Sequence, residues 1–130
     1  MSLMGCLLVL LGGFLGGVAR FYISGTIGRW IGETFPWGTF VVNVSGCLLI
    51  GMLAGLMRTA DGQFAGELFR DFAFVGVCGG YTTVSSFCLQ TLNLAMDGEP
   101  QRAAGNVVLS VVACMVAVAI GDLAVLRIAA

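Results

Sequence analysis

Residues 76–87 read Gly76-Val-Cys-Gly-Gly-Tyr-Thr-Thr-Val-Ser-Ser-Phe87 and lie inside an apolar run, from about 72 to 94, that is long enough to cross a bilayer. Adjacent glycines and clustered Ser and Thr hydroxyls disfavour a continuous helix. Irregular backbone at membrane depth is tolerated only where protein buries it or water reaches it, and in transporters such breaks hold ions. The alternative is an unbroken helix whose small residues let a neighbour approach closely. The spacing alone leaves both interpretations open.

The composition is that of a membrane protein. Of the 130 residues, 58% are hydrophobic and 10% are charged, and the mean hydropathy is +1.01, whereas soluble domains carry about 25% charged residues. A net charge of −1 without any lysine argues against a nucleic-acid partner. The chain has no histidine and no nucleophile–base pair, so an enzyme is not expected. The five cysteines occur singly in apolar runs, which indicates packing residues and not a disulfide framework.

Four segments are long and apolar enough to span hydrocarbon, at about residues 3–23, 38–56, 72–94 and 104–126. The connections between them are short, so neighbouring helices should run antiparallel in a compact bundle. We therefore expect an all-α membrane protein in which residues 1–130 form a single domain and the third of four transmembrane helices is broken at mid-membrane.

The arginines are balanced between the two ends of such a bundle. With four spans, both termini lie on the same side of the membrane, and that side holds three arginines: Arg58, Arg70 and Arg127. The other side holds Arg29 and Arg102, and Arg20 as well if it lies beyond the end of the first span. Cytoplasmic loops normally carry an excess of basic residues. The near-parity favours no single orientation and is compatible with insertion in both.

A lone four-helix bundle fills its own core, so a pore would form more readily between subunits. The first two spans offer glycine-rich faces for close packing, with GxxxG-type spacing at 12–16, 13–17 and 51–55. This pattern is frequent in membrane helices and indicates helix association without identifying the partner.

Polar residues inside a span are expensive, and each is therefore a candidate for function. Asn43 lies in the middle of the second span. Asn106, Ser110 and Cys114 recur at i, i+4 and i+8 of the fourth, which places them on one stripe of a helix. Neutral hydrogen-bond donors suit a partly dehydrated anion, whereas a cation pathway would present carboxylates or carbonyls. Bonds between helices are the alternative role for these residues, and the residues themselves do not choose between the two.

Arg20, near the end of the first span, has two possible roles: its charge snorkels to the interface or draws anions into a vestibule. The first three spans carry no embedded Asp or Glu, on which proton-coupled antiport usually relies.

Three motifs in the chain are specific enough to indicate a family: Gly12-Gly-Phe-Leu-Gly-Gly-Val-Ala-Arg20-Phe-Tyr22, Trp37-Gly-Thr-Phe-Val-Val-Asn43-Val-Ser-Gly46 and the 76–87 stretch quoted above. With these motifs the chain resembles the Fluc (CrcB-type) fluoride channels. The order of the motifs, their spacing and the chain length match the family over essentially the whole sequence, and the third motif is the most specific.

The resemblance implies an antiparallel, dual-topology homodimer with two fluoride pores and a buried central sodium ion. It places Asn43 and Phe87 in the fluoride pathway, with Asn106, Ser110 and Cys114 at the polar positions of the fourth helix. The hydroxyls of the third span, at Thr83 and Ser86, would add donors. The backbone carbonyls of Gly79 and Thr82 would hold sodium at the dimer axis.

The sequence departs from the family pattern at two positions. Val84 stands where the family has the first of two phenylalanines, so this wall of the fluoride pathway lacks a ring, and Gln90 replaces an acidic residue. Both departures leave the expected fold unchanged and bear on pore stoichiometry and conduction.

The sequence thus predicts a passive fluoride-selective channel in the bacterial cytoplasmic membrane that exports fluoride and lowers its toxicity. One alternative is a small four-span, dual-topology drug exporter, which would carry a glutamate in the first span that is missing here. The other is a non-conducting membrane subunit whose polar residues only join helices.

Overall fold

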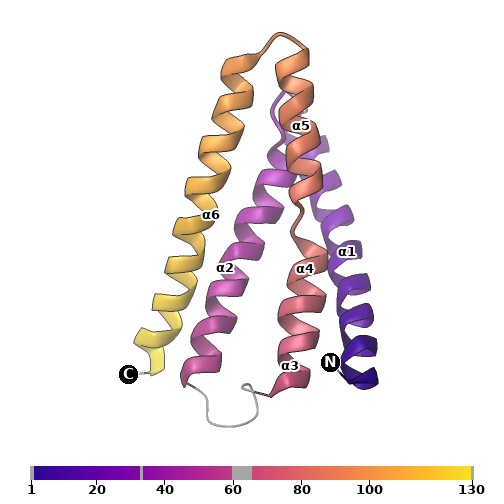
Figure 1. The fold of residues 1–130 in the computed structure, drawn as a ribbon. Coiled ribbons are helices and arrows are strands. Elements are labelled where there is room, and N and C mark those ends of the chain that lie inside the picture. Colours follow the sequence, from indigo (N-terminus) through magenta and orange to yellow (C-terminus); the bar gives the residue numbers. More distant parts are fainter. Residues whose placement is uncertain (1, 33, 60–65, 130) are drawn as a thin grey trace.

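The computed structural model describes residues 2–32, 34–59 and 66–129, and the connection at 60–65 lies outside them. All regular structure in these residues is helical (Figure 1). Three of the long helices are continuous: α1 (Leu3–Ile31), α2 (Trp37–Thr59) and α6 (Pro100–Ala129). The third long helix is composite and consists of α3 (Glu67–Arg70), the π-helical segment η1 (Asp71–Cys78), α4 (Gly79–Tyr81) and α5 (Val84–Met96).

Among the described residues, four helices are long and apolar enough to cross a membrane, and the four expected spans lie within them. The first, α1, is capped at its start by Ser2, whose hydroxyl accepts a hydrogen bond from the N–H of Gly5 at 3.1 Å. It ends at Gly32, where a φ of 95° suits glycine. Both termini lie at one end of the bundle, and the α1–α2 and α5–α6 connections lie at the other (Figure 1). We call these the terminal end and the connection end.

The third long helix is interrupted where the sequence predicts. Tyr81 closes α4, and the next two residues are extended, with φ/ψ of −75°/155° at Thr82 and −147°/116° at Thr83. Helix α5 then starts at Val84, and the Thr83 hydroxyl caps it by accepting from the N–H of Ser86 at 3.2 Å. Figure 1 shows the break about halfway along the bundle.

Glycines hold the helices in two close pairs. On α1, a methyl group placed on Gly12 would lie 2.8 Å from the backbone N of Val77 and 2.9 Å from the Cα of Gly76, so α1 packs backbone to backbone against η1. A methyl group on Gly51 or Gly121 would likewise meet the backbone of the facing helix where α2 packs on α6. The small-residue spacings at 12–16 and 51–55 therefore join helices of the same chain, whereas Gly17 of the 13–17 spacing meets no neighbouring helix among the described residues.

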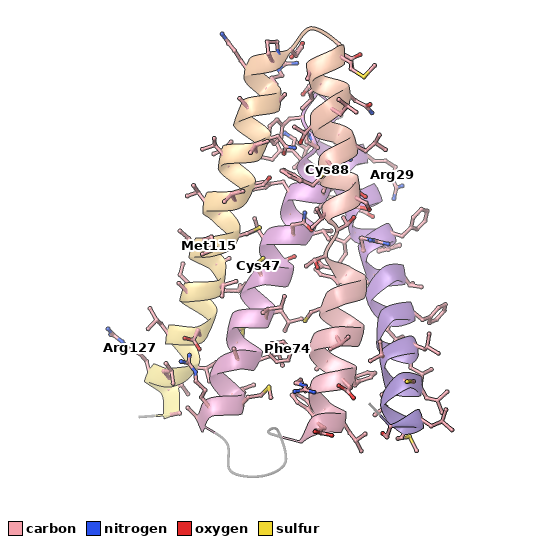
Figure 2. All side chains as sticks on the ribbon, viewed as in Figure 1. Arg29, Cys47, Phe74, Cys88, Met115 and Arg127 are labelled. Atoms are coloured by element: carbon pink, nitrogen blue, oxygen red, sulfur yellow. The ribbon has the colours of Figure 1, made fainter. Side chains whose placement is uncertain are left out.

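A charged pair ties the terminal ends of two helices together. Arg58 of α2 donates to a carboxylate oxygen of Asp122 on α6. Arg127 lies at the same end of the bundle, whereas Arg29 lies towards the connection end (Figure 2). Basic side chains thus stand at both ends of the described bundle.

Adjacent glycines on α1 allow a matched test of this packing. Gly16→Ala would drive a methyl group into the carbonyl oxygen of Val77 and to 2.8 Å from the N of Tyr81, whereas Gly17→Ala meets nothing within 4 Å. We expect Gly16→Ala to lower the apparent Tm of the protein in detergent, at a cost of about 1–3 kcal/mol for overpacking. Gly17→Ala should leave Tm unchanged. Equal Tm values for the two variants would contradict the α1–η1 contact.

Candidate functional site

Asn43 of α2 binds the backbone of the break through both polar atoms of its side-chain amide. Its Oδ1 accepts a hydrogen bond from the N–H of Thr83 at 2.7 Å, and its Nδ2 donates to the carbonyl of the same residue at 3.0 Å. One side chain therefore replaces, at this residue, both of the hydrogen bonds that a helix would supply. These two hydrogen bonds join α2 to the third long helix, so the interhelical role that the sequence left open for Asn43 is present. We call this pair of hydrogen bonds the Asn43 clasp.

The Asn43 clasp also changes the backbone hydrogen bonds one helical turn before Thr83. In an unbroken α-helix the N–H of Thr83 would donate to the carbonyl of Gly79, four residues before it. Because that N–H is bound to Asn43, the Gly79 carbonyl loses its helical donor. The N–H of Thr82 donates at 3.0 Å to the carbonyl of Cys78, as does its hydroxyl.

Hydroxyl groups crowd the start of α5. The Oγ of Ser85 and the Oγ of Ser86 lie 3.2 Å and 3.1 Å from the Thr83 Oγ1. On the other side of the break, the hydroxyl of Tyr81 and the Ser45 hydroxyl of α2 lie 2.8 Å apart. The interruption is therefore a concentrated set of hydrogen-bonding groups inside an otherwise apolar span.

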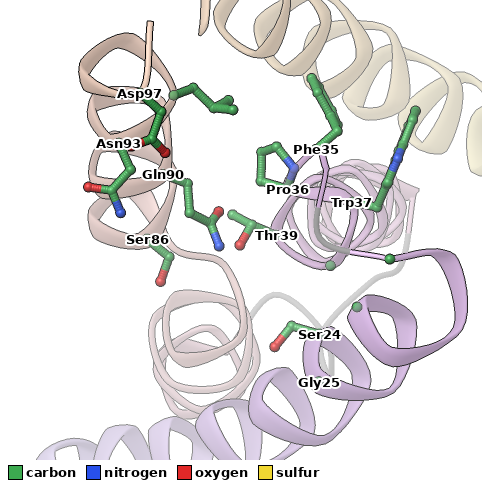
Figure 3. Close-up of a pocket in the computed structure, with 14 residues that line it drawn as sticks. Ser24, Gly25, Phe35, Pro36, Trp37, Thr39, Ser86, Gln90, Asn93 and Asp97 are labelled. Atoms are coloured by element: carbon green, nitrogen blue, oxygen red, sulfur yellow. The ribbon is translucent and has the colours of Figure 1, made fainter. Parts of the chain in front are cut away.

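Two cavities lead from the connection end towards this break. The outer one, about 530 Å³, lies between the ends of α1, α2 and α5, and Figure 3 shows Gln90, Asn93 and Asp97 on one of its sides and Thr39 and Trp37 on another. The inner one, about 240 Å³, is lined by two apolar residues and five polar ones: Phe21 and Val42, with Arg20, Ser24, Thr39, Thr83 and Ser86. Ser24, Thr39 and Ser86 line both cavities, so three hydroxyl side chains stand where the two adjoin.

Arg20 brings a positive charge to the inner cavity. The ion pairs among the described residues join other side chains, namely Arg58–Asp122, Arg70–Asp71 and Arg102–Glu99. No Asp or Glu lines the inner cavity within the described residues, and Asp97 lines only the outer one. The inner cavity therefore combines one guanidinium with several hydroxyl donors, a set of groups that attracts an anion.

The polar stripe of α6 joins α5 through a chain of hydrogen bonds. The Ser110 hydroxyl donates to Oδ1 of Asn106 at 3.3 Å, and Nδ2 of Asn106 donates to Oγ1 of Thr91 at 2.8 Å. The Thr91 hydroxyl donates in turn to the carbonyl of Phe87 at 2.7 Å. Asn106 and Ser110 are buried within the chain, at 2% and 6% exposure, and Cys114 continues the stripe beside Cys47 of α2.

The remaining predicted residues lie at or next to the break and differ in exposure. Val84 is 75% exposed, Gly79 is exposed, and Thr82 and Phe87 are partly covered. The structure thus brings Asn43, Thr83, Ser86 and Arg20 together at the inner cavity and break, and it places Asn106 and Ser110 on a separate hydrogen-bonded stripe. Gly79 and Val84 instead face away from the chain's own interior.

Sequence reasoning missed three contributors to this site. Thr39 and Ser24 line both cavities, and Thr91 links α5 to α6. The position of Thr91, one helical turn after Phe87, was the available signal, because a hydroxyl at i+4 can bond back to the carbonyl of residue i. Gln90, which was singled out for replacing an acid, has a buried Oε1 without a hydrogen-bond partner among the described residues.

Comparison with known proteins identifies the family. The model of the CrcB-like protein family, described as Camphor Resistance (CrcB), matches residues 7–122. Fluoride-specific ion channel FluC 4 of Brucella abortus is 58% identical over 121 residues, which cover 93% of this chain and 91% of the relative. Fluoride-specific ion channel FluC of Opitutus terrae is 52% identical over 118 residues, covering 91% and 89%.

A third relative, fluoride-specific ion channel FluC of Rhodospirillum rubrum, is 51% identical over 115 residues, which cover 88% of this chain and 89% of the relative. The similarity therefore extends over the four apolar helices, the broken third helix and the residues of the inner cavity. The chain is a multi-pass membrane protein that belongs to the CrcB family.

Proposed function

We propose that this protein is a passive, fluoride-selective channel that exports fluoride across the bacterial cytoplasmic membrane. The observation that carries the proposal is the inner cavity, in which Arg20 and the hydroxyls of Ser24, Thr39, Thr83 and Ser86 lie together without a carboxylate among the described residues. The relatives named as fluoride-specific channels, at 51–58% identity, support fluoride as the anion.

Fluoride is small and strongly hydrated, so a pathway must replace its water with close hydrogen-bond donors. Arg20 raises the local anion concentration by its charge, and the hydroxyls of Thr83 and Ser86 offer short contacts beyond it. Phe87 adds the positive edge of its ring, and Asn106 and Ser110 supply donors along α6. Val84, where the family carries a further phenylalanine, leaves one wall of this route without an aromatic edge.

No energy source beyond the membrane potential is required for export. An inside-negative potential favours outward movement of an anion by about 2.3 kcal/mol per charge per 100 mV. Hydrogen fluoride enters cells as the neutral acid and dissociates inside, which supplies the anion. A channel of this kind therefore lowers internal fluoride without ATP or a proton-coupling carboxylate.

The exposed side of the break supports a second copy of the chain as the partner. The Gly79 carbonyl, which has lost its helical donor to Asn43, cannot face lipid, because every unpaired polar group costs several kcal/mol there. Yet Gly79 and Val84, on either side of the break, are exposed in the single chain. Two copies meeting at their breaks would cover both, and arginines at both ends of the bundle are compatible with an antiparallel, dual-topology pair.

Sodium fits the carbonyls that would face this partner. The Gly79 carbonyl has lost its helical donor to the Asn43 clasp, and Thr82 belongs to the extended segment. Unwound backbone carbonyls are the groups with which membrane proteins bind Na⁺. A sodium ion held by Gly79 and Thr82 of both subunits would supply a fixed positive charge and satisfy these carbonyls, as a structural and not a transported ion.

Vesicles that contain the purified protein test the channel directly. Liposomes are loaded with potassium fluoride and made permeable to potassium with valinomycin, and they should then release fluoride, which an external electrode measures. Liposomes loaded with potassium chloride should release far less chloride. Protein-free liposomes are the control. Proton-driven uptake of a quaternary ammonium compound without fluoride release would instead indicate the drug exporter, and neither activity would indicate a non-conducting subunit.

Dual topology is tested by labelling one engineered cysteine at the connection end. Gln101 is exposed, and Gln101→Cys can be introduced into a variant from which the native cysteines have been removed. An impermeant maleimide applied to intact cells should label about half of the protein and should label the rest only after lysis. Labelling of nearly all of it, or of none, before lysis would reject the antiparallel pair.

Sodium binding is expected to depend on Asn43, because its clasp frees the Gly79 carbonyl. Replacing N-methylglucamine by sodium should raise the Tm of the wild type by about 5 °C, and Asn43→Leu should remove this difference. Asn93→Leu, at an exposed asparagine of α5, should retain it. If sodium raises the Tm of Asn43→Leu as much as that of the wild type, sodium binding does not depend on the Asn43 clasp. If sodium does not raise the Tm of the wild type, the sodium site is rejected.

A further inference from the structure

Thr91 was not among the residues that the sequence or the family resemblance pointed to, yet it occupies the centre of the hydrogen-bond chain between α5 and α6. Its Oγ1 accepts from Nδ2 of Asn106 at 2.8 Å, and its own hydrogen goes to the Phe87 carbonyl at 2.7 Å. Among the described residues, this is the hydrogen bond that connects α5 with the polar stripe of α6.

The hydrogen bond to Phe87 favours one orientation of the Asn106 amide, the one with Nδ2 towards Thr91. A hydroxyl carries one hydrogen, and that of Thr91 is already donated within its own helix. If the amide were turned over, Oδ1 of Asn106 would face the Thr91 oxygen, and Thr91 would have to give up its bond to the Phe87 carbonyl to supply a hydrogen there. Because Asn106 is 2% exposed within the chain, solvent does not replace the lost bond.

The orientation of Asn106 controls which groups the stripe can offer to an anion. With Nδ2 towards Thr91, one amide hydrogen is used and the second remains available. Oδ1 meanwhile faces Ser110 and accepts its hydroxyl hydrogen at 3.3 Å, the longest bond of the chain. A hydroxyl can rotate about its C–O bond, so Ser110 can give its hydrogen to a passing anion while Asn106 stays in place.

We propose that Thr91 is a positioning residue of the anion pathway: it holds the amide of Asn106 so that its N–H donors, and not its carbonyl, are available to fluoride. The inference rests on the proposed function, since it assumes that Asn106 and Ser110 line the route. Thr91 itself does not touch the ion. Its effect is transmitted through one hydrogen bond, and Thr91 should therefore lose its influence when Asn106 no longer has an amide.

A double-mutant comparison in fluoride-efflux vesicles tests this. Thr91→Val keeps the shape of the side chain but removes the hydroxyl, and efflux should fall about fivefold, the factor that corresponds to one typical hydrogen bond. Thr91→Ser keeps the hydroxyl and should restore efflux to near the wild-type rate. In an Asn106→Leu background, Thr91→Val should produce no further decrease.

Thr26→Val is the matched control, because Thr26 also donates to the carbonyl four residues before it, at 2.8 Å, but lies on α1 away from Asn106. It should leave efflux unchanged. If Thr91→Val does not give a monodisperse protein, Thr91→Ala removes the same hydroxyl and enters the same comparison.

Equal effects of the Thr91 substitution with and without Asn106 would overturn the positioning role, as would a Thr91→Ser protein as slow as Thr91→Val. Either result, with normal wild-type efflux, leaves the proposed function intact. Wild-type vesicles that release no fluoride would overturn the proposed function and this inference with it.

Discussion

The two hydrogen bonds between Asn43 and the backbone of Thr83 are the interaction on which the rest of this structure depends. A chain that interrupts a helix inside a membrane exposes an N–H and a C=O that lipid cannot satisfy, at a cost of several kcal/mol each. The Asn43 amide supplies one acceptor and one donor in the geometry of a missing helical turn. An aliphatic residue at position 43 would leave both groups unpaired, and the third span would gain by closing into an ordinary helix.

Close backbone packing places the clasp where it can act. Gly46, one turn after Asn43 on α2, faces Thr82 and Tyr81, and a methyl group there would strike the Thr82 side chain. Gly16 and Gly80 similarly allow α1 and α4 to meet through backbone atoms. These glycines bring both neighbouring helices against the break, which leaves the two cavities above it between α1, α2 and α5. The cavities therefore follow from the packing of small residues below them.

Much of this arrangement could be predicted from sequence because it depends on local properties. Hydropathy locates the spans, adjacent glycines and hydroxyls locate the break, and helical periodicity places Asn106 and Ser110 on one stripe. The hydrogen-bond partners of these groups could not be predicted in this way, because they depend on how each helix is rotated about its axis relative to its neighbours. Asn43 is 40 residues away from Thr83, and Thr91 is 15 residues away from Asn106. No local pattern pairs them, so clasp and pathway remained equally good interpretations of the same amide.

These two interpretations are compatible once the donors are counted. An asparagine amide has two N–H donors, and in both Asn43 and Asn106 one of them binds a protein acceptor: the Thr83 carbonyl and the Thr91 hydroxyl. The bond to protein holds the side chain rigidly, and the second hydrogen can still be given to an ion. A rigid donor needs no reorganisation when the anion arrives, whereas a free amide could turn its carbonyl towards the negative charge. In the proposed channel, a small anion would exchange tightly bound water for protein donors, and the hydrogen bonds that join the helices would hold the remaining amide donors in place for it.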